Sequence, residues 1–442
     1  MENIADRPLH ALSLLEALRG IRCRLFTAEG YTQALLARIA SLDEEVRAWS
    51  WLVPAEALKA ARLSDMRIQP DAPPGPLQGL PVGVKDIFAT AGIPTEMGSP
   101  AYAGCVPNVS AGVVERLESR GGFVMGKTVT TECAFLTPGK TRNPWNPLHT
   151  PGGSSSGSAA AVAAGFIPAA LGTQTNGSVI RPAAYCGIVG FKPTQGLLPI
   201  EGALTFSHTL DQPGVFTRRV EDAAWLAAWL TDDETRIPPE LRVRSTPPTL
   251  AAVRTPVWEQ AEEHAQENFA ENIQTLKKSG AGVEEVELPE IFGLAHRTIR
   301  TIMAAEAAFN LEDVHHRKAP LLSRTLKDFL SEGRGVGALA YMQALDLRRS
   351  LKDELERFLM RYDAIITLPT TGEAPATLEQ TGTPTFCSIW SLCGVPAITI
   401  PVGFGPRGLP LGLQIVGARG KDGHLLSAAH WCEGLFPFPL LR

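Results

Sequence analysis

Two serine-containing segments and one lysine carry side chains that could act together in nucleophilic chemistry. Ser178 lies in the run TQTNGSVIRP, and three further serines occupy positions 154–156 in PGGSSSG. A serine hydroxyl is a weak nucleophile until a neighbouring base removes its proton. Lys85 ends the apolar run LPVGVK, which is an unusual place for a charged side chain. We therefore interpret these residues as candidates for one catalytic site.

A buried lysine is the remaining candidate for the base, because the Gly/Ser-rich segment 148–194 contains a single histidine, His149. Burial disfavours the ammonium form and lowers the pKa of a lysine, so that a neutral amine becomes available near physiological pH. The turn at residues 175–178 offers successive backbone N–H groups that can converge on one developing oxyanion. Lysine, serines and turn together suggest acyl transfer.

Two short motifs in the chain are misleading. GGFVMGKT at 121–128 fits the pattern of a phosphate-binding loop, but a helical pattern precedes it and FVM reads as a strand. GSSSG at 153–157 fits the nucleophile elbow of α/β-hydrolases, which must follow a buried strand. The preceding NPWNPLHTPG has three prolines and cannot be a central strand. A serine esterase completed by His208 or His424 is kept as an alternative.

The segment that carries both serine groups must itself be buried. Residues 148–194 are rich in Gly, Ser and Thr, yet apolar runs at 159–164 and 166–171 interrupt them. Flexible linkers lack such runs. We expect a tight turn at 152–158, a helix and strand over 159–171, and a second turn at 173–181.

Strands alternating with helices predict an α/β fold: a single domain with a mixed, mainly parallel, doubly wound central sheet covered by helices on both faces. The expected parts are an N-terminal helical segment (1–66), a catalytic core (79–230), a mostly helical insertion or cover (231–360) and a C-terminal part of the sheet (361–442). Apolar runs predict strands at 46–53, 80–88, 123–130, 249–255, 283–288, 363–369, 396–403 and 411–418, and periodicity predicts helices at 111–122, 220–230, 258–278 and 425–433.

The composition of the 442-residue chain is that of an ordinary soluble protein. A net charge of -5 supplies no basic face for nucleic acid or an anionic membrane. The acidic start shows no secretory signal, and no apolar run is long enough to cross a bilayer. Seven scattered cysteines without a CxxC pair predict reduced thiols in a cytoplasmic protein, with no metal site.

At this point the motifs resemble those of a known family. PGGSSSGSAAAVAAG followed by LGTQTNGSVIRPAAYCGIVGFKPT resembles the diagnostic motif of the amidase signature family over almost its whole length. LPVGVKDIFATAGIPTEMGS, GKTVTTECAF and CGVPAITIPVGF with GLPLGLQIVGA extend the resemblance over most of the chain. The resemblance implies the amidase signature fold and hydrolysis of linear amides without a metal or organic cofactor.

The resemblance also implies a Ser-cisSer-Lys triad. Ser178 matches the nucleophile, Lys85 the base, and Ser154 the bridging serine whose preceding peptide bond is cis. Ser155 is expected to bond to the lysine from the second layer, or else to be a solvated turn serine. The oxyanion hole falls on four residues of the turn: Thr175, Asn176, Gly177 and Ser178.

Two departures from the family pattern concern the nucleophile turn. Gln174 and Asn176 stand where many members have an aspartate and a glycine. Asn tolerates left-handed backbone angles, so we expect the turn to survive with an added side chain beside the substrate. Arg181 lies three residues after the nucleophile, an arrangement most similar to the malonamidase branch. It could bind a substrate carboxylate or pair with an internal one.

Pocket-lining residues are expected outside the signature. The candidates lie in PTEMGSPAY, in 204–212 and in 386–390, and the residues assigned to substrate binding are Met97, Gly152, Arg181 and Trp390. Several of these are apolar or aromatic, which favours a hydrophobic or aryl amide, ester or carbamate.

The expected function is therefore that of a free-standing amidase for a small-molecule amide. It would act as a cytoplasmic homodimer without nucleic-acid or membrane partners. The alternative from a different class is the amidase subunit of a tRNA-dependent amidotransferase complex.

Overall fold

A computed structural model describes residues 7–68, 74–231, 233 and 235–441 of the chain. Residues 1–6 of the expected N-terminal segment, and residues 232 and 234 of the expected insertion, lie outside this described part. The strands are β1 Trp49–Trp51, β2 Pro81–Lys85, β3 Phe123–Thr128, β4 Ala169–Gln174, β5 Val189–Lys192, β6 Gln212–Thr217, β7 Thr249–Arg254, β8 Gly282–Glu287, β9 Ala364–Thr367, β10 Ala397–Phe404 and β11 Pro410–Val416. The helices are α1 Leu14–Arg22, α2 Ala28–Val46, α3 Pro54–Met66, α4 Gly112–Ser119, α5 Ser156–Ala163, α6 Ile180–Cys186, α7 Val220–Leu230, α8 Glu263–Lys278, α9 Ala295–Asn310, α10 Glu312–Lys318, α11 Arg324–Arg334, α12 Ala338–Leu359, α13 Ser388–Cys393 and α14 Asp422–Glu433.

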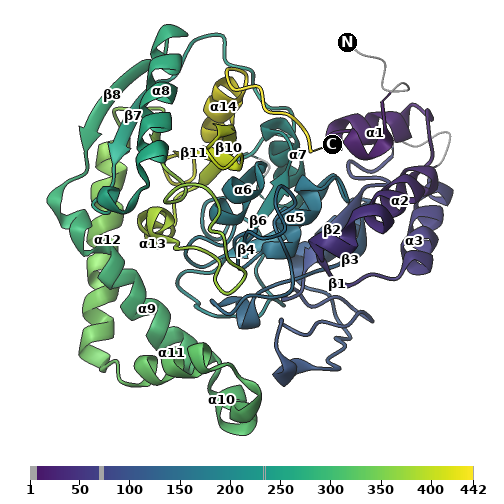
Figure 1. Cartoon of the computed structure of the whole chain (residues 1–442), viewed down its shortest axis with the longest axis horizontal. Coiled ribbons are helices and arrows are strands. Elements are labelled where there is room, and N and C mark those ends of the chain that lie inside the picture. Colours follow the sequence, from purple (N-terminus) through teal and green to yellow (C-terminus); the bar gives the residue numbers. More distant parts are fainter. Residues whose placement is uncertain (1–6, 69–73, 232, 234, 442) are drawn as a thin grey trace.

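One 11-stranded mixed sheet runs through the molecule in the order β1-β3-β2-β4-β6-β5-β10-β11-β9-β7-β8 (Figure 1). The single-domain α/β fold with a mixed sheet is thus confirmed. The share of parallel pairing is smaller than expected. Four neighbouring pairs are parallel (β3-β2, β2-β4, β9-β7, β7-β8), and six are antiparallel (β1-β3, β4-β6, β6-β5, β5-β10, β10-β11, β11-β9).

Helices cover both faces of the sheet, and the strand residues alternate between them. In β7, Leu250 and Ala252 pack into one core cluster, whereas Ala251 and Val253 pack into another. The first face is covered by α4, α7, α8 and α14. The second is covered by α2, α3 and α5 toward β1 and by α9, α12 and α13 toward β8. Burial on both faces explains why the strands read as continuous apolar runs.

Several expected elements are shorter in the structure, and two of them are bounded by identifiable neighbours. The strand expected at 46–53 is reduced to β1, because α2 continues to Val46 and α3 begins at Pro54. The helix expected at 258–278 is divided into a 3-10 turn and α8. Ala261 and Glu262 between them are extended, and the Glu262 N–H donates to Thr371 O at 2.7 Å.

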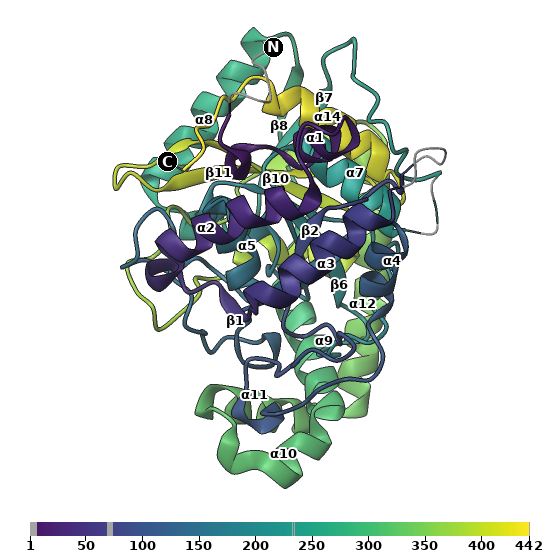
Figure 2. The ribbon, with the colours of Figure 1, turned by 90° about the vertical axis from the view of Figure 1, so that its right-hand side faces the viewer.

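The expected insertion (231–360) contributes strands as well as helices. β7 and β8 end the sheet on one side, and α9 to α12 form an arm that projects beyond it, with α10 near the tip (Figures 1 and 2). Within the described residues, no helix combines the length and the apolar character that crossing a membrane requires. The seven cysteines are free thiols, as predicted. The cytoplasmic location stays a prediction.

Candidate active site

The site is built where β2 and β4 end side by side in the sheet. Lys85 is the last residue of β2 and is fully buried. Its Nζ donates to Ser154 Oγ and to Thr173 Oγ1, both at 2.8 Å. Burial lowers the pKa of Lys85 to about 7, against a smaller upward effect of Asp211. A neutral amine in contact with a serine hydroxyl is therefore accessible near neutral pH.

The turn that carries Ser154 is fixed on both sides of the residue. The Gly153–Ser154 peptide bond is cis, as the resemblance implied. Gly153 O accepts from Arg181 Nη2 at 2.6 Å, and Ser154 O accepts from the Thr131 N–H at 3.2 Å. Gly152 has φ +80, and a Cβ there would lie 2.8 Å from Pro182 Cα. Gly152 thus shapes this turn through its backbone.

Gly157 allows helix α5 to pack closely after this turn. The Gly157 N–H donates to Val129 O at 2.9 Å, and a Cβ at Gly157 would lie 2.3 Å from Ala48 O and 2.4 Å from Val129 N. Gly157→Ala is therefore expected to destabilise the fold by about 2 to 4 kcal/mol, because backbone atoms cannot move aside cheaply. Thermal denaturation measures this effect. Gly293→Ala is the control, since a Cβ there meets nothing within 4 Å, and equal losses in the two variants would contradict the steric argument.

Gln174 holds the turn that carries Ser178. Its Oε1 accepts from the N–H groups of Val179 at 2.8 Å and Ile180 at 3.0 Å, at the start of α6. Its Nε2 donates to Ser391 Oγ on α13 at 2.9 Å. Ser178 itself is 8% exposed. The neutral amide satisfies the first N–H groups of α6, so the departure from aspartate leaves the turn supported.

Asn176 does not behave as expected. It is absent from the described non-glycine residues with positive φ, so the turn needs no left-handed residue there. Asn176 Oδ1 accepts from Ser388 Oγ at 2.9 Å, and Asn176 O accepts from Ser391 Oγ. The side chain is thus held by α13, and its place beside the substrate stays a prediction.

Ser155 makes no direct bond to Lys85, and it is not a solvated turn serine. It is fully buried, and its Oγ donates to Thr173 O at 3.2 Å and accepts from the Thr173 N–H at 3.4 Å. The second hydroxyl that contacts Lys85 belongs to Thr173, which no motif in the sequence singled out. Ser155 therefore supports the lysine one step removed, through the Thr173 backbone.

Three non-glycine residues with left-handed backbone angles meet beside Lys85 and Ser154: Met97 (φ 56), Cys133 (φ 47) and Ala134 (φ 59). The Met97 N–H donates to Asp86 O at 3.0 Å, and Met97 O accepts from the Cys133 N–H at 2.8 Å. Left-handed residues other than glycine cluster at functional sites. Met97 was selected from the sequence, but Cys133 and Ala134 were missed, because neither type signals such angles.

Arg181 is buried and has no carboxylate partner among the described residues. Its Nη2 donates to Gly153 O and, at 3.2 Å, to Thr381 Oγ1, whereas Nε and Nη1 have no partner within the described part. Burial lowers the pKa of its guanidinium. The internal ion pair expected as its structural role is thus replaced by a bond to the backbone just before Ser154. This bond ties α6, which follows Ser178, to the Ser154 turn.

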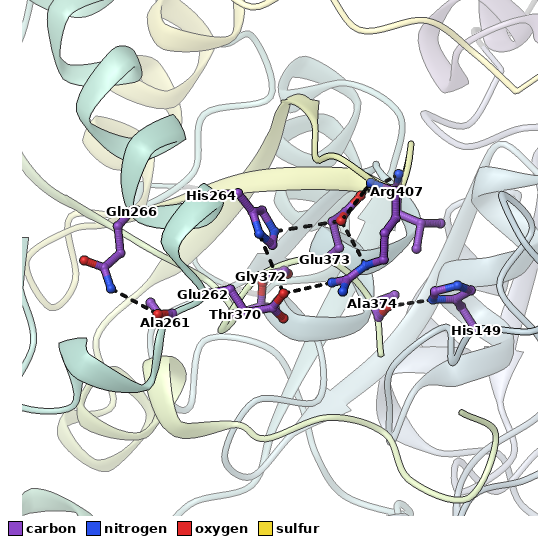
Figure 3. Close-up of polar contacts among 11 residues, drawn as sticks. His149, Ala261, Glu262, His264, Gln266, Thr370, Gly372, Glu373, Ala374 and Arg407 are labelled. Atoms are coloured by element: carbon purple, nitrogen blue, oxygen red, sulfur yellow. Dashed lines mark hydrogen bonds and ion pairs between the residues drawn. The ribbon is translucent and has the colours of Figure 1, made fainter. Parts of the chain in front are cut away.

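Residues 369–384 follow β9 and pass over the turns that carry Ser154 and Ser178. We call this segment the strap. Its buried Glu373 accepts from the N–H groups of Arg407 and Leu409 and pairs with Arg407 Nε at 3.0 Å (Figure 3). His149 Nδ1 lies 2.7 Å from Ala374 O (Figure 3). Farther along, Thr381 bonds to Arg181. The strap is therefore a fixed wall of the site.

The expected pocket segment 386–390 lies in the core instead. Phe386 and Trp390 are 1% and 0% exposed, and they pack into two different core clusters. Trp390 Nε1 has no partner among the described groups. Trp390 is thus a core residue of α13 rather than a substrate contact, which corrects its assignment. An aromatic side chain after a proline-rich run fits either environment.

Comparison with known proteins agrees with this geometry. The family model described as Amidase matches residues 31–426.

The chain belongs to the amidase family. A glutamyl-tRNA(Gln) amidotransferase subunit of Alkaliphilus metalliredigens is 32% identical over 96% of this chain and 96% of its own. A crystal structure of an amidase has a TM-score of 0.88 at 30% identity, covering 96% of this chain and 100% of that one. The native peptide amidase of Stenotrophomonas maltophilia has a TM-score of 0.83 at 27% identity, covering 97% and 98%. The family and its fold are therefore those that the signature motifs implied.

Proposed function

We propose that this amidase hydrolyses linear C–N bonds of small amides through a serine acyl-enzyme, with Ser178 as nucleophile. The observation that carries the proposal is the 2.8 Å contact between Nζ of buried Lys85 and Ser154 Oγ. The bond from Arg181 to Gly153 O supports it by tying the segment that follows Ser178 to the segment that precedes Ser154.

In the proposed acylation step, neutral Lys85 takes a proton from Ser154 while Ser154 takes the proton of Ser178. The Ser178 oxygen attacks the amide carbonyl and forms a tetrahedral intermediate. The N–H groups of Val179 and Ile180 already donate to Gln174, so the oxyanion role falls on the turn amides of residues 175–178. The relay then returns the proton to the leaving amine, and water hydrolyses the acyl-enzyme by the same path.

Arg181 is proposed to position the Ser154 turn for every substrate. Arg181→Ala removes the donor to Gly153 O, so we expect kcat to fall by about 10- to 100-fold for neutral amides and for malonamate alike. Steady-state kinetics on both substrates measures this effect. A loss confined to malonamate, visible mainly in KM, would instead assign Arg181 to a substrate carboxylate, as the resemblance to the malonamidase branch suggests.

Membership of an amidotransferase complex is the second candidate. The names of relatives 32% and 33% identical over 96% of the chain favour it, because they specify a tRNA and a multi-subunit enzyme. These names weigh against the expectation that no nucleic acid is involved. The net charge of -5 supplies little basic surface for tRNA and favours the free-standing enzyme.

One experiment separates the two candidates. The purified chain is incubated alone with aliphatic amides, malonamate, anilides, aryl esters and aryl carbamates, and release of amine or alcohol is followed. We expect turnover of at least one amide without any partner. If no substrate is turned over alone, and glutamine becomes one only when partner proteins are added, the free-standing function is wrong. Sedimentation of the same sample tests the predicted homodimer.

A further inference from the structure

Asp211 lies at the end of the loop 204–211 and organises that loop through its carboxylate. Its Oδ2 accepts from the N–H groups of Phe206 at 2.7 Å and Ser207 at 2.9 Å. Its Oδ1 accepts from Thr175 Oγ1 at 2.5 Å. The carboxylate thus binds its own loop with one oxygen and the first residue of the Ser178 turn with the other. Asp211 lies within the candidate pocket segment 204–212, but the sequence assigned no individual role to it.

The far side of the same loop is held by a different carboxylate. Glu306 on α9 accepts from the Thr209 N–H at 2.9 Å, from Tyr341 Oη on α12 at 2.6 Å, and from the hydroxyls of Ser207 and Thr209. The projecting helices therefore fix the loop from outside. Asp211 is free to face the catalytic turn, and its position does not depend on the Thr175 bond alone.

Asp211 is also the one described carboxylate whose charge acts on Lys85. Asp86, the neighbour of Lys85 in sequence, points to another strand and pairs with Lys127 at 3.3 Å. The groups that contact Lys85 Nζ are the neutral hydroxyls of Ser154 and Thr173. When the relay protonates Lys85, Asp211 is the counter-charge that the fold supplies.

We propose that Asp211 is a positioning residue of the amidase reaction: its carboxylate holds the oxyanion turn through Thr175 and stabilises Lys85 in the protonated form that acylation produces. This inference rests on the proposed function. The chemistry is that of a buried carboxylate beside a base, which favours the charged form of that base at the moment it takes a proton.

Each of the two groups shifts the pKa of the other in the direction that this role needs. Burial raises the pKa of Asp211 to about 6, although the bonds from Thr175, Ser207 and Phe206 oppose the rise. Burial lowers the pKa of Lys85 to about 7, and the charge of Asp211 opposes that fall. The Asp211 anion therefore favours the ammonium form of Lys85, which is the form that acylation produces.

The test follows the rate at which a fluorophosphonate labels Ser178, across pH 5 to 9. In this single step, the Ser178 oxygen bonds to phosphorus, fluoride leaves, and the proton passes to Lys85. Asp211→Asn keeps a side-chain oxygen as acceptor but removes the charge. We expect the acid limb of the profile to move to lower pH by at least about 0.5 unit, and the plateau rate to fall about tenfold.

Thr175→Val is the matched control, because it removes the hydroxyl bond and keeps the charge. Its acid limb should not move to lower pH, while its plateau rate falls. If Asp211→Asn loses rate but keeps the wild-type limb, Asp211 has a merely structural role and the proposal is overturned.

Folding is checked by thermal denaturation, and Asp211→Glu serves if the Asn variant does not fold. The Glu variant keeps the charge, so the acid limb of its pH–rate profile should lie within about 0.2 pH unit of the wild-type limb. If that limb moves to lower pH, as expected only for loss of the charge, the proposal is overturned. If the proposed function itself is wrong, the result differs. The fluorophosphonate would then either fail to label wild type or label a variant that lacks Lys85 at the same rate.

Discussion

Ser178→Ala is expected to reduce amide turnover by at least about 10⁴-fold while leaving the chain folded. Removing the nucleophile of a serine triad leaves only the contribution of the oxyanion hole and of substrate binding. The side chain is nearly buried and loses only its hydroxyl oxygen, so the melting temperature should change by little. Steady-state kinetics on the best substrate of the amide panel measures the loss.

The control for this variant is another serine-to-alanine change, at a site without chemistry. Ser331 is exposed on α11 and donates to Lys327 O, so Ser331→Ala should keep full turnover. Mass spectrometry adds a second readout, because wild type should accumulate an acyl adduct on a slow ester and Ser178→Ala should not. Full turnover by Ser178→Ala would refute the acyl-enzyme mechanism.

The residues of the proposed chemistry could be found from the sequence because each lies in a distinctive local pattern. Lys85 ends an apolar strand. Ser154 and Ser178 lie in turns that contain more glycine and serine than an ordinary core segment. The apolar residues that flank these turns distinguish them from a flexible linker. Lys85 contacts Thr173 because β2 pairs in parallel with β4, which places both strand ends at one edge of the sheet. Local pattern and sheet geometry therefore agree here.

The groups that support these residues could not be found in the same way, because they come from distant parts of the chain. Asp211 reaches Thr175, and Thr381 reaches Arg181 across 200 positions. Neither pair leaves a local pattern. Trp390 illustrates the opposite error, since an aromatic residue reads equally well as core or pocket until its neighbours are known.

The directions of the strands could not be predicted from the sequence. Strands buried on both faces read as apolar runs whether their partners are parallel or antiparallel. β6 is inserted between β4 and β5 and runs antiparallel to both, and nothing in QPGVFT distinguishes it from a parallel strand. The alternation of strands and helices thus predicted the layers correctly but not the pairing.

Lys85→Met is expected to abolish acylation and also to stabilise the fold at neutral and lower pH. The pKa of Lys85 is 10.5 in its ordinary environment and about 7 in the folded chain. Between these values the unfolded chain binds a proton that the folded chain does not, so wild-type stability rises with pH from about 7 to 10.5. Below pH 7 burial of Lys85 lowers the free energy of unfolding of wild type by its full amount, on the order of 4 kcal/mol. The variant gains less than this amount, because it also loses the two hydrogen bonds of Lys85.

Thermal denaturation of Lys85→Met at pH 6.5 and pH 9.5 therefore tests whether burial keeps Lys85 neutral, as the proposed base requires. The variant should melt a few degrees above wild type at pH 6.5, and the difference should shrink at pH 9.5, where the wild-type lysine is neutral in the folded chain. Lys59→Met is the control, because Lys59 is exposed on α3 and should show no such pH dependence. A variant that melts below wild type by the same amount at both pH values would show that Lys85 contributes to stability as a hydrogen-bond donor. If burial keeps the base neutral, removing Lys85 should abolish activity and stabilise the fold at the same time. The destabilisation caused by the buried lysine would then be retained because the reaction needs a neutral amine.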